Sequence, residues 1–260
     1  MIKLILTSMI ISIFAFSAKA TDQGESEKAA YKLSNESELS LIQIGGNTNV
    51  ETYNGKTLTK YEKEKSVFAV SGHYTVAFYK TVDTDGDSVT RESARNWDLL
   101  GKYERVLSEN INGFVGLQYE GDEFSGFKQR ENIDFGGKYL LIKTDKVNAS
   151  IELGARHTIE KNVERDSDDE DVFNYSKARI YFEHAQVYSE ALSWKIWIEY
   201  LPNFTESEDY LVNYEPSVSF LLSSSFSLKT AYKVTYDNQP NLEGNDKKDY
   251  KLTTSLLARF

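Results

Sequence analysis

The sequence of 260 residues has no cysteine, only 3 prolines and, beyond its N-terminal region, no long apolar run. Without cysteine there is no disulfide scaffold, no thiol nucleophile and no Cys-ligated zinc, and we expect no lipid anchor on a cysteine. A mean hydropathy of −0.50 is too polar for a protein that crosses a membrane with helices. The scarcity of proline favours uninterrupted strands, because proline removes a donor from a β-ladder.

Aromatic residues, in contrast, are abundant, and the charge is strongly acidic. The chain has 17 Tyr and 14 Phe, which together with modest hydrophobicity favours long strands that have one polar face. If residues 1–20 are removed, Lys3 and Lys19 are lost, and 28 basic against 40 acidic residues give a net charge of 28 − 40 = −12. We expect no nucleic-acid partner, because phosphate binding needs a basic surface.

The N-terminal residues predict a secretory signal peptide over residues 1–20. Lys3 precedes an apolar stretch over 4–16, and Ala18 and Ala20 give an A-x-A cleavage pattern. The alternative, a membrane anchor, needs about 20 apolar residues. Residues 21–37 are polar and aperiodic, which predicts a linker, and a third region, 38–260, predicts the folded domain.

From residue 38 to the end, apolar and polar residues alternate with a period of two, and no helical period appears. We count about twelve strands near or above the roughly 9–11 residues of a tilted membrane-spanning strand, the first hairpin being 38–45 and 50–61. The prediction is an all-β fold, a transmembrane antiparallel up-and-down β-barrel. Pro216 lies inside the tenth strand and predicts a bulge or kink.

Alternation alone does not fix which face points inward, and a soluble periplasmic β-protein would hide its apolar face inside. Short connections near 62–65, 107–110, 143–146, 188–191 and 223–225 alternate with long polar ones near 81–92, 121–128, 161–172, 202–208 and 237–248. Tight turns at one end and long loops at the other are typical of outer-membrane barrels. An even strand number places both ends of the barrel sequence on the tight-turn, periplasmic side.

Aromatic residues also gather near both ends of the expected strands, as in the two interfacial belts of membrane proteins, although strands are enriched in aromatics in general. Near the tight turns are Tyr61, Tyr103, Tyr139, Trp194, Phe226 and Phe260, and near the long loops are Phe78, Tyr119, Tyr200, Tyr210, Tyr236 and Tyr250.

The last twelve residues form an alternating strand that ends in an aromatic residue. It resembles the C-terminal strand by which bacterial outer-membrane barrels are recognised for assembly. The expected partners are the barrel-assembly machinery, outer-membrane lipid and lipopolysaccharide, and small solutes. The residues of the predicted assembly signal are Tyr250, Leu252, Leu256, Ala258 and Phe260.

The polar face of the strands is rich in charges of both signs and is the candidate lining of the barrel interior. Ion pairs across the interior would close it, whereas separated rings of charge would leave a small, weakly selective channel; Trp197 on the same face would narrow it. The candidate lining residues are Glu120, Asp122, Arg130, Asp134, Lys138, Glu152, Arg156, Lys177, Arg179, Glu183, Lys195, Glu199, Glu215, Lys229 and Lys233.

Two motifs suggest chemistry, and each has a simpler explanation. His73 shares its face with Ser71 and Thr75, a spacing similar to that of the outer-membrane phospholipase, but Thr75 replaces the serine of that motif and its Gly-Arg context is missing, which favours a lining histidine. Asp83, Asp85 and Asp87 suggest calcium, but without the pattern of an EF-hand they read as a solvated acidic loop. We therefore predict no catalytic residue, no metal site and no cofactor, with an outer-membrane lipolytic enzyme as the alternative function.

Several segments resemble the salt-induced outer-membrane protein family, a bacterial family of unknown function. The resemblance covers about residues 38–260 and implies an outer-membrane barrel linked to salt or osmotic stress; it implies no reaction. Residues 81–92 and 164–171 have no counterpart in it. The segments are ELSLIQIGGNTN (38–49), LSENINGFVGLQYEGDEFSGFKQRENIDFGGKY (107–139), WIEYLPNF (197–204), YEPS (214–217), FSLKTAYKVTYDNQP (226–240) and DYKLTTSLLARF (249–260).

Overall fold

A computed structural model describes residues 31–45, 49–162, 172–240 and 246–260. The predicted signal peptide over 1–20, the linker as far as residue 30 and the acidic stretch 164–171 lie outside the described residues. Within them there is no helix that is long and apolar enough to cross a bilayer.

The described residues form a closed antiparallel barrel of twelve strands, which confirms the predicted fold class. The short 3₁₀ turn η1 (Glu123–Ser125) follows the fifth strand. The strands are β1 (Tyr31–Ile44), β2 (Val50–Lys63), β3 (Ser66–Val82), β4 (Ser88–Val106), β5 (Ile111–Asp122), β6 (Phe127–Lys143), β7 (Val147–Asn162), β8 (Val172–Val187), β9 (Leu192–Pro202), β10 (Tyr210–Leu221), β11 (Phe226–Asp237) and β12 (Lys248–Arg259).

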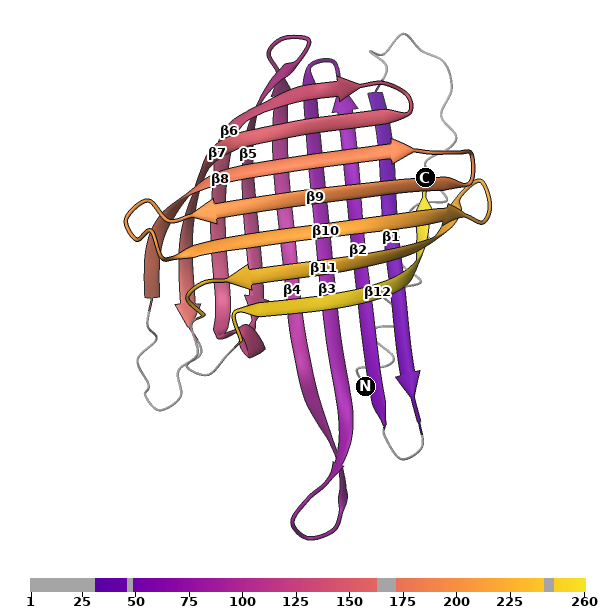
Figure 1. Ribbon diagram of the computed structural model, residues 1–260, viewed down its shortest axis with the longest axis vertical. Coiled ribbons are helices and arrows are strands. Elements are labelled where there is room, and N and C mark those ends of the chain that lie inside the picture. The colour runs from indigo at the N-terminus through magenta and orange to yellow at the C-terminus, as the bar shows by residue number, and fades with distance from the viewer. Residues whose placement is uncertain (1–30, 46–48, 163–171, 241–245) are drawn as a thin grey trace.

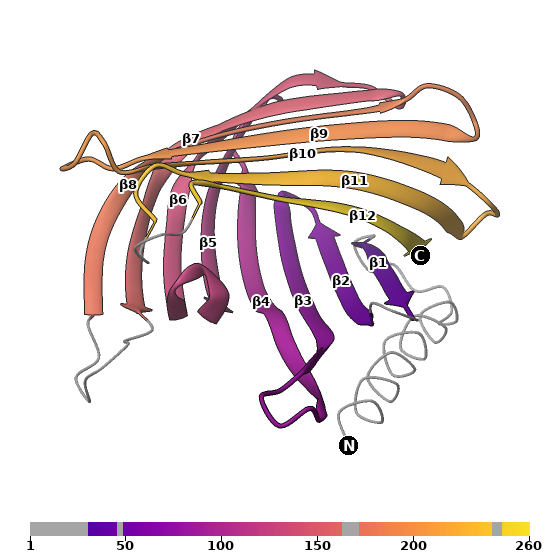
Figure 2. The same ribbon diagram turned by 60° about the horizontal axis from the view of Figure 1, so that its bottom comes forward.

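Each strand pairs with its neighbours in the chain, and β12 pairs with β1. Figure 1 shows β9–β12 crossing in front of β1–β4 at a steep angle. Figure 2, turned from the first view, shows the sheet curling until the end of β12 returns to β1. The strong twist of the strands places residues from β12 opposite residues of β3 across the interior.

The contact between β1 and β12 is the closing seam of the barrel, and it is short. Its register runs from Glu36–Arg259 to Leu39–Leu256. Next to the Glu36–Arg259 pair, Asn35 and Phe260 exchange backbone hydrogen bonds of 2.9 and 3.0 Å. The backbone pairing ends at Leu39. Beyond it, the hydroxyl of Ser40 donates to the carbonyl of Thr254 at 2.8 Å, so a side chain extends the contact between β1 and β12.

The predicted alternation of connection lengths holds only in part: the connection near 121–128 is only residues 123–126, as short as the tight turn 107–110, whereas 203–209 is longer. Tight turns occupy residues 64–65, 107–110, 144–146, 188–191 and 222–225, between consecutive strands. The start of β1 lies at this same end, because Tyr31 pairs with Lys63 beside the first tight turn. The end of β12 lies there too, because Arg259 donates its backbone N–H to Ser225 at 2.9 Å.

Two strand boundaries and one predicted bulge differ from the sequence prediction. Strand β1 begins at Tyr31, so residues 31–37 of the predicted linker are strand; their pairing with β2 outweighs their polar composition. Much of the predicted loop 81–92 is strand, since Val82 pairs with Ser88 and only 83–87 turn. Pro216 interrupts the β10–β11 ladder between Tyr214 and Ser217 but causes no shift of register, so the predicted bulge is wrong.

The outer surface of the barrel is apolar. Phe135 and Leu153, on the outer face of neighbouring strands, are 57% and 56% exposed, and Leu117 is 59% exposed. Rings gather at both ends of the strands. At the tight-turn end Tyr31, Tyr61, Phe68 and Tyr103 follow one another with centroids 5.6, 6.5 and 4.8 Å apart; at the other end Tyr200, Tyr210 and Tyr236 are 6.0 and 5.9 Å apart.

Candidate functional site

The charged face of the strands points into the barrel, where it forms one connected network and several separate groups. Alternation along each strand puts successive side chains on opposite faces. Asp134 therefore faces inward between the exposed residues Ile133 and Phe135. Glu152 is only 2% exposed, whereas its neighbour Leu153 is exposed. The interior is thus the polar side of the molecule.

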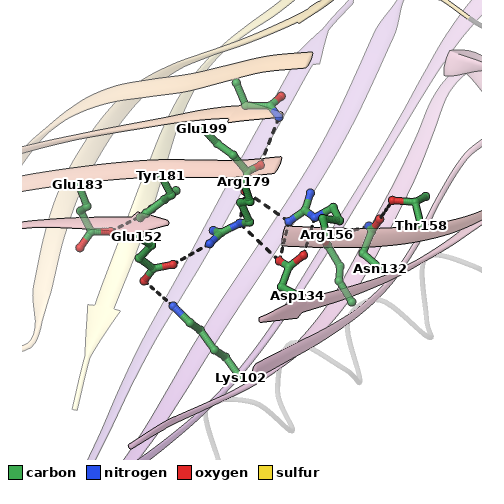
Figure 3. Close-up of polar contacts among 12 residues, drawn as sticks. Lys102, Asn132, Asp134, Glu152, Arg156, Thr158, Arg179, Tyr181, Glu183 and Glu199 are labelled. Atoms are coloured by element: carbon green, nitrogen blue, oxygen red, sulfur yellow. Dashed lines mark hydrogen bonds and ion pairs between the residues drawn. The ribbon is translucent and has the colours of Figure 1, made fainter. Parts of the chain in front are cut away.

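The largest network comprises eight charged residues from β4 and β6–β9, and we call it the paired wall. Figure 3 shows its members Lys102, Asp134, Glu152, Arg156, Arg179 and Glu199. The paired wall contains four cations and four carboxylates, so its formal charge balances. Its members are Lys102, Glu104, Asp134, Lys138, Glu152, Arg156, Arg179 and Glu199.

Two arginines hold the centre of the paired wall. Arg156 lies directly opposite Asp134 in the β6–β7 register and binds it with two hydrogen bonds, of 2.7 and 2.8 Å. Arg179 donates to Glu152 and to Glu199 at 2.7 Å each and lies 3.4 Å from Asp134. Paired forks of this kind are stronger and more directional than single contacts.

Lys102 links strands that are not neighbours. Its ammonium lies 2.5 Å from Glu152 of β7 and 2.9 Å from Glu104, so it crosses over β5 and β6. It passes above the ring of Phe114, 4.6 Å from the ring centroid, and Arg179 lies 5.6 Å from the same centroid. The ring of Phe114 thus makes cation–π contacts with two cationic side chains on the inner surface of the barrel.

Glycines make room for this ring. Gly136 and Gly154 are opposite each other in register, and both fall at inward positions of their strands. A Cβ added at Gly136 would lie 2.7 Å from the Cα of Gly154 and 2.9 Å from Phe114 Cζ. The pair therefore allows two backbones and one ring to approach more closely than any larger residue permits.

Separate ion pairs lie toward the long loops. Arg130 pairs with Glu160, which also accepts a 2.8 Å hydrogen bond from the hydroxyl of Tyr175. Glu120 lies 3.5 Å from Arg130, and Lys177 lies 2.7 Å from Asp209 in the β9–β10 connection.

Two further predicted lining residues pair at the other end of the barrel, and one lies apart. Lys195 binds Glu183 at 2.8 Å, and both are partly open to water. Asp122, a predicted lining residue, instead accepts the N–H of Ser125 at 3.1 Å and caps η1. Trp197, which the sequence places inward, stacks on Tyr181 with ring centroids 6.1 Å apart.

The opposite part of the interior, from β1–β3 and β10–β12, is less completely paired. Lys229 lies 2.8 Å from Glu38 of β1 and 3.7 Å from Glu215. Lys233 and Lys251 occupy directly opposite positions of β11 and β12. They form no ion pair with any residue that the structure describes.

His73 sits in a chain of polar contacts on this side. Its Nδ1 lies 3.1 Å from Asp98, and its Nε2 lies 2.9 Å from the hydroxyl of Thr75. Thr75 also accepts hydrogen bonds from Asn54 at 2.5 Å and from the ammonium of Lys251 at 3.1 Å. The order acid, histidine, hydroxyl is that of a hydrolase triad. Thr75 is only 3% exposed, and its oxygen already has three polar partners.

The remaining motifs from the sequence make local contacts outside the interior network. Asp83 accepts the N–H groups of Asp85 at 3.1 Å and Asp87 at 2.8 Å, so its carboxylate closes the turn itself. Among the described residues no group of acidic or histidine side chains is arranged to hold a metal ion. His157 contacts Ser176, and His184 packs on Trp194, both away from the interior network.

Several interior residues were missed by the sequence prediction. The same alternation that places Trp97, Leu99 and Tyr103 outside would have found Asp98, Lys102 and Glu104 of β4, because each of them directly follows or precedes one of these residues. The missed residues are Glu38, Lys56, Asp98, Lys102, Glu104, Glu160, Asp209 and Lys251.

Comparison with known proteins gives a family and a set of similar folds. No curated protein matches the chain. A solved outer-membrane channel, COG4313 from Pseudomonas putida F1, is similar at 10% identity and a TM-score of 0.48, covering 92% of this chain and 100% of that one. The translocator domain of the autotransporter NalP from Neisseria meningitidis has 6% identity, a TM-score of 0.46 and coverage of 98% and 95%.

The NanC porin has 10% identity, a TM-score of 0.45 and coverage of 88% and 98%. Identities this low assign no function. The family match is of another kind, because it spans most of the chain, although its description mentions neither salt nor a reaction. Residues 37–260 match the family described as "Protein of unknown function, DUF481", and the chain belongs to this family.

Proposed function

We propose that this protein is a non-enzymatic channel of the bacterial outer membrane that lets small solutes pass through its interior. One observation carries the proposal: the barrel is closed, with an apolar outer surface and a charged inner one. A soluble β-protein reverses this arrangement, since it buries its apolar side chains.

The environment that fits the outer surface is hydrocarbon. Backbone polar groups in a bilayer must be satisfied within the protein, which a closed barrel achieves. The rows of rings near both ends of the strands match the positions of the two interfaces. We extend the proposal to export by the signal peptide over residues 1–20 and to assembly through the β12 residues Tyr250, Leu252, Leu256 and Phe260, whose side chains are all exposed. Ala258, the fifth residue of the predicted signal, is fully buried, because it packs within the closing seam.

The channel itself is tested with refolded protein in planar bilayers. We expect discrete conductance steps, because the inner face offers charged and hydrated groups to ions. Protein that inserts but gives no current above that of the lipid alone would refute the transport role. A role in salt or osmotic stress rests on the sequence resemblance alone and stays outside this proposal.

The inside-out arrangement has its own test. Spin labels at Leu153→Cys and Lys195→Cys should report lipid and water respectively, since Leu153 faces out and Lys195 faces the interior. Exchanged environments would overturn the membrane placement together with the interior assignment.

A further inference from the structure

Three lysines that face the interior lack the ion pairs found elsewhere in it. Lys56 of β2, Lys233 of β11 and Lys251 of β12 form what we call the lysine cluster. Lys233 and Lys251 are direct cross-strand partners. Lys56 lies two residues from Asn54, on the same face, and Asn54 contacts His73 and Thr75 inside the barrel.

Like charges in direct register repel each other and destabilise a sheet. The electrostatic surroundings of Lys251 include Lys233 and Lys56, both of which repel it. Within the described residues none of the three ammonium groups makes an ion pair. An arrangement of this kind is stable with a counter-charge, which an anion from solution can provide.

The carboxylates nearby are too few to neutralise the lysine cluster. Glu215 interacts with Lys56, Lys229, Lys233 and Lys195 at once, and it also attracts Lys251. Asp122 also attracts Lys251, but it is held as the cap of η1. Glu38 is engaged by Lys229 at 2.8 Å, and Asp98 by His73 at 3.1 Å. With Glu38 and Asp98 engaged elsewhere, the three ammonium groups share Glu215 and Asp122 and form an ion pair with neither.

The lysine cluster is open to water at Lys56, whereas the centre of the paired wall is buried. Lys56 is exposed although it faces the interior, and Lys233 and Lys251 are partly exposed. Glu152 in the paired wall is 2% exposed. Lys251 is anchored, because its ammonium donates to Thr75 at 3.1 Å on the opposite strand β3. One ammonium is thus fixed across the interior, and two more lie on the walls beside it.

We infer that the lysine cluster is a binding site for small oxyanions, carboxylates or phosphates, and that it makes the channel selective for anions. The inference rests on the proposed channel and names the class of solute that it passes. Lysine suits this task, since its ammonium is a compact charge with three donors on a flexible stem. Positive charge in a narrow low-dielectric passage raises the local concentration of anions by about tenfold or more.

The first test is the reversal potential of the refolded protein in a gradient of potassium chloride. We expect chloride to be about tenfold more permeant than potassium at low ionic strength. In the triple variant K56Q/K233Q/K251Q, Glu215 remains, so the preference should disappear or turn toward potassium. The triple variant with arginine at the same positions keeps the charge and should stay selective for chloride.

A matched control removes three exposed lysines in or beside the tight turns, in the variant K63Q/K65Q/K146Q. It lowers the net charge of the protein equally and should keep the selectivity of the wild type. Correct folding of every variant is checked by heat-modifiable migration on gels. If the control and the triple glutamine variant change selectivity equally, the site assignment is wrong.

A second test does not need current. Calorimetric titration of the protein in detergent with inorganic phosphate, and separately with malonate, should show binding that K56Q/K233Q/K251Q loses by about tenfold or more. Binding of one probe alone identifies the type of oxyanion. Conductance without anion preference and without binding would overturn the site but leave the channel, whereas binding without conductance would leave the site and overturn the channel.

Discussion

The two sides of the barrel interior use the same alternation to opposite effect. In the paired wall, Arg156 stands directly opposite Asp134, and every charge meets its opposite. On β11 and β12, Lys233 stands directly opposite Lys251, and like charges meet. The comparison teaches that alternation decides which residues enter the interior, whereas register decides whether they neutralise one another. The first side is built for stability, and the second retains charge for a solute.

The largest effect is expected where the paired wall loses its central cation. Arg179→Met should lower the free energy of unfolding by about 3–5 kcal/mol, because the paired wall is then left with four carboxylates and three cations, and Glu152 and Glu199 lose their shared partner. Unfolding in urea, followed in lipid vesicles by tryptophan fluorescence, measures it.

The matched control is Lys195→Met, which removes a cation whose partner Glu183 is partly exposed. It should cost less than about 1 kcal/mol. Equal losses in the two variants would show that burial does not distinguish the ion pairs of the paired wall from the others.

A smaller effect is expected at the glycines beneath Phe114. Gly154→Ala should destabilise the barrel by about 1–3 kcal/mol, because the new methyl group meets the carbonyl of Phe135 and lies 3.1 Å from the Cα of Gly136. Gly101→Ala is the control, since nothing lies within 4 Å of a Cβ there. If the Gly154 variant unfolds at the same midpoint as the wild type, the prediction is wrong, because β6 and β7 would then accommodate the methyl group without losing stability.

The smallest effect has the opposite sign. Lys233→Gln should raise stability by about 0.2–1 kcal/mol at low salt, because it removes a like-charge pair. Lys229→Gln, four residues earlier on the same face, should lower it, since Glu38 then loses its partner at 2.8 Å. The same unfolding measurement, repeated at high salt, should show both differences shrink. Destabilisation by Lys233→Gln would contradict the comparison of the two sides.

The sequence predicts the fold of this protein well because both of its main signals are local. The alternation of apolar and polar residues identifies each strand and its outward face, and turn length separates the two ends of the barrel. Both signals come from residues that are close together in the sequence. The boundary of β1 was missed because Lys32, Ser34 and Asn35 are polar. They are strand because β2 pairs with them, which composition does not reveal.

The interior chemistry was predicted only in part. The lining residues of β6–β9 follow from alternation, but their partners depend on register and on the curvature of the barrel. Lys102 meets Glu152 across two intervening strands, and Lys251 meets Thr75 across the interior. The first pair is separated by 50 positions in the sequence and the second by 176, so a local sequence pattern cannot predict either contact.

The short closing seam has a consequence for how the barrel forms. Each other strand pair is a hairpin between consecutive strands, whereas the closing seam joins Ser40 to Thr254, 214 residues apart. Closing so long a loop costs roughly 3 kcal/mol more in chain entropy than closing a short hairpin. High contact order slows folding, so we expect eleven hairpin contacts to form first and the ring to close last. Closure then depends on few residues, Asn35–Leu39 and Leu256–Phe260, which makes this seam the place where the finished barrel first comes apart.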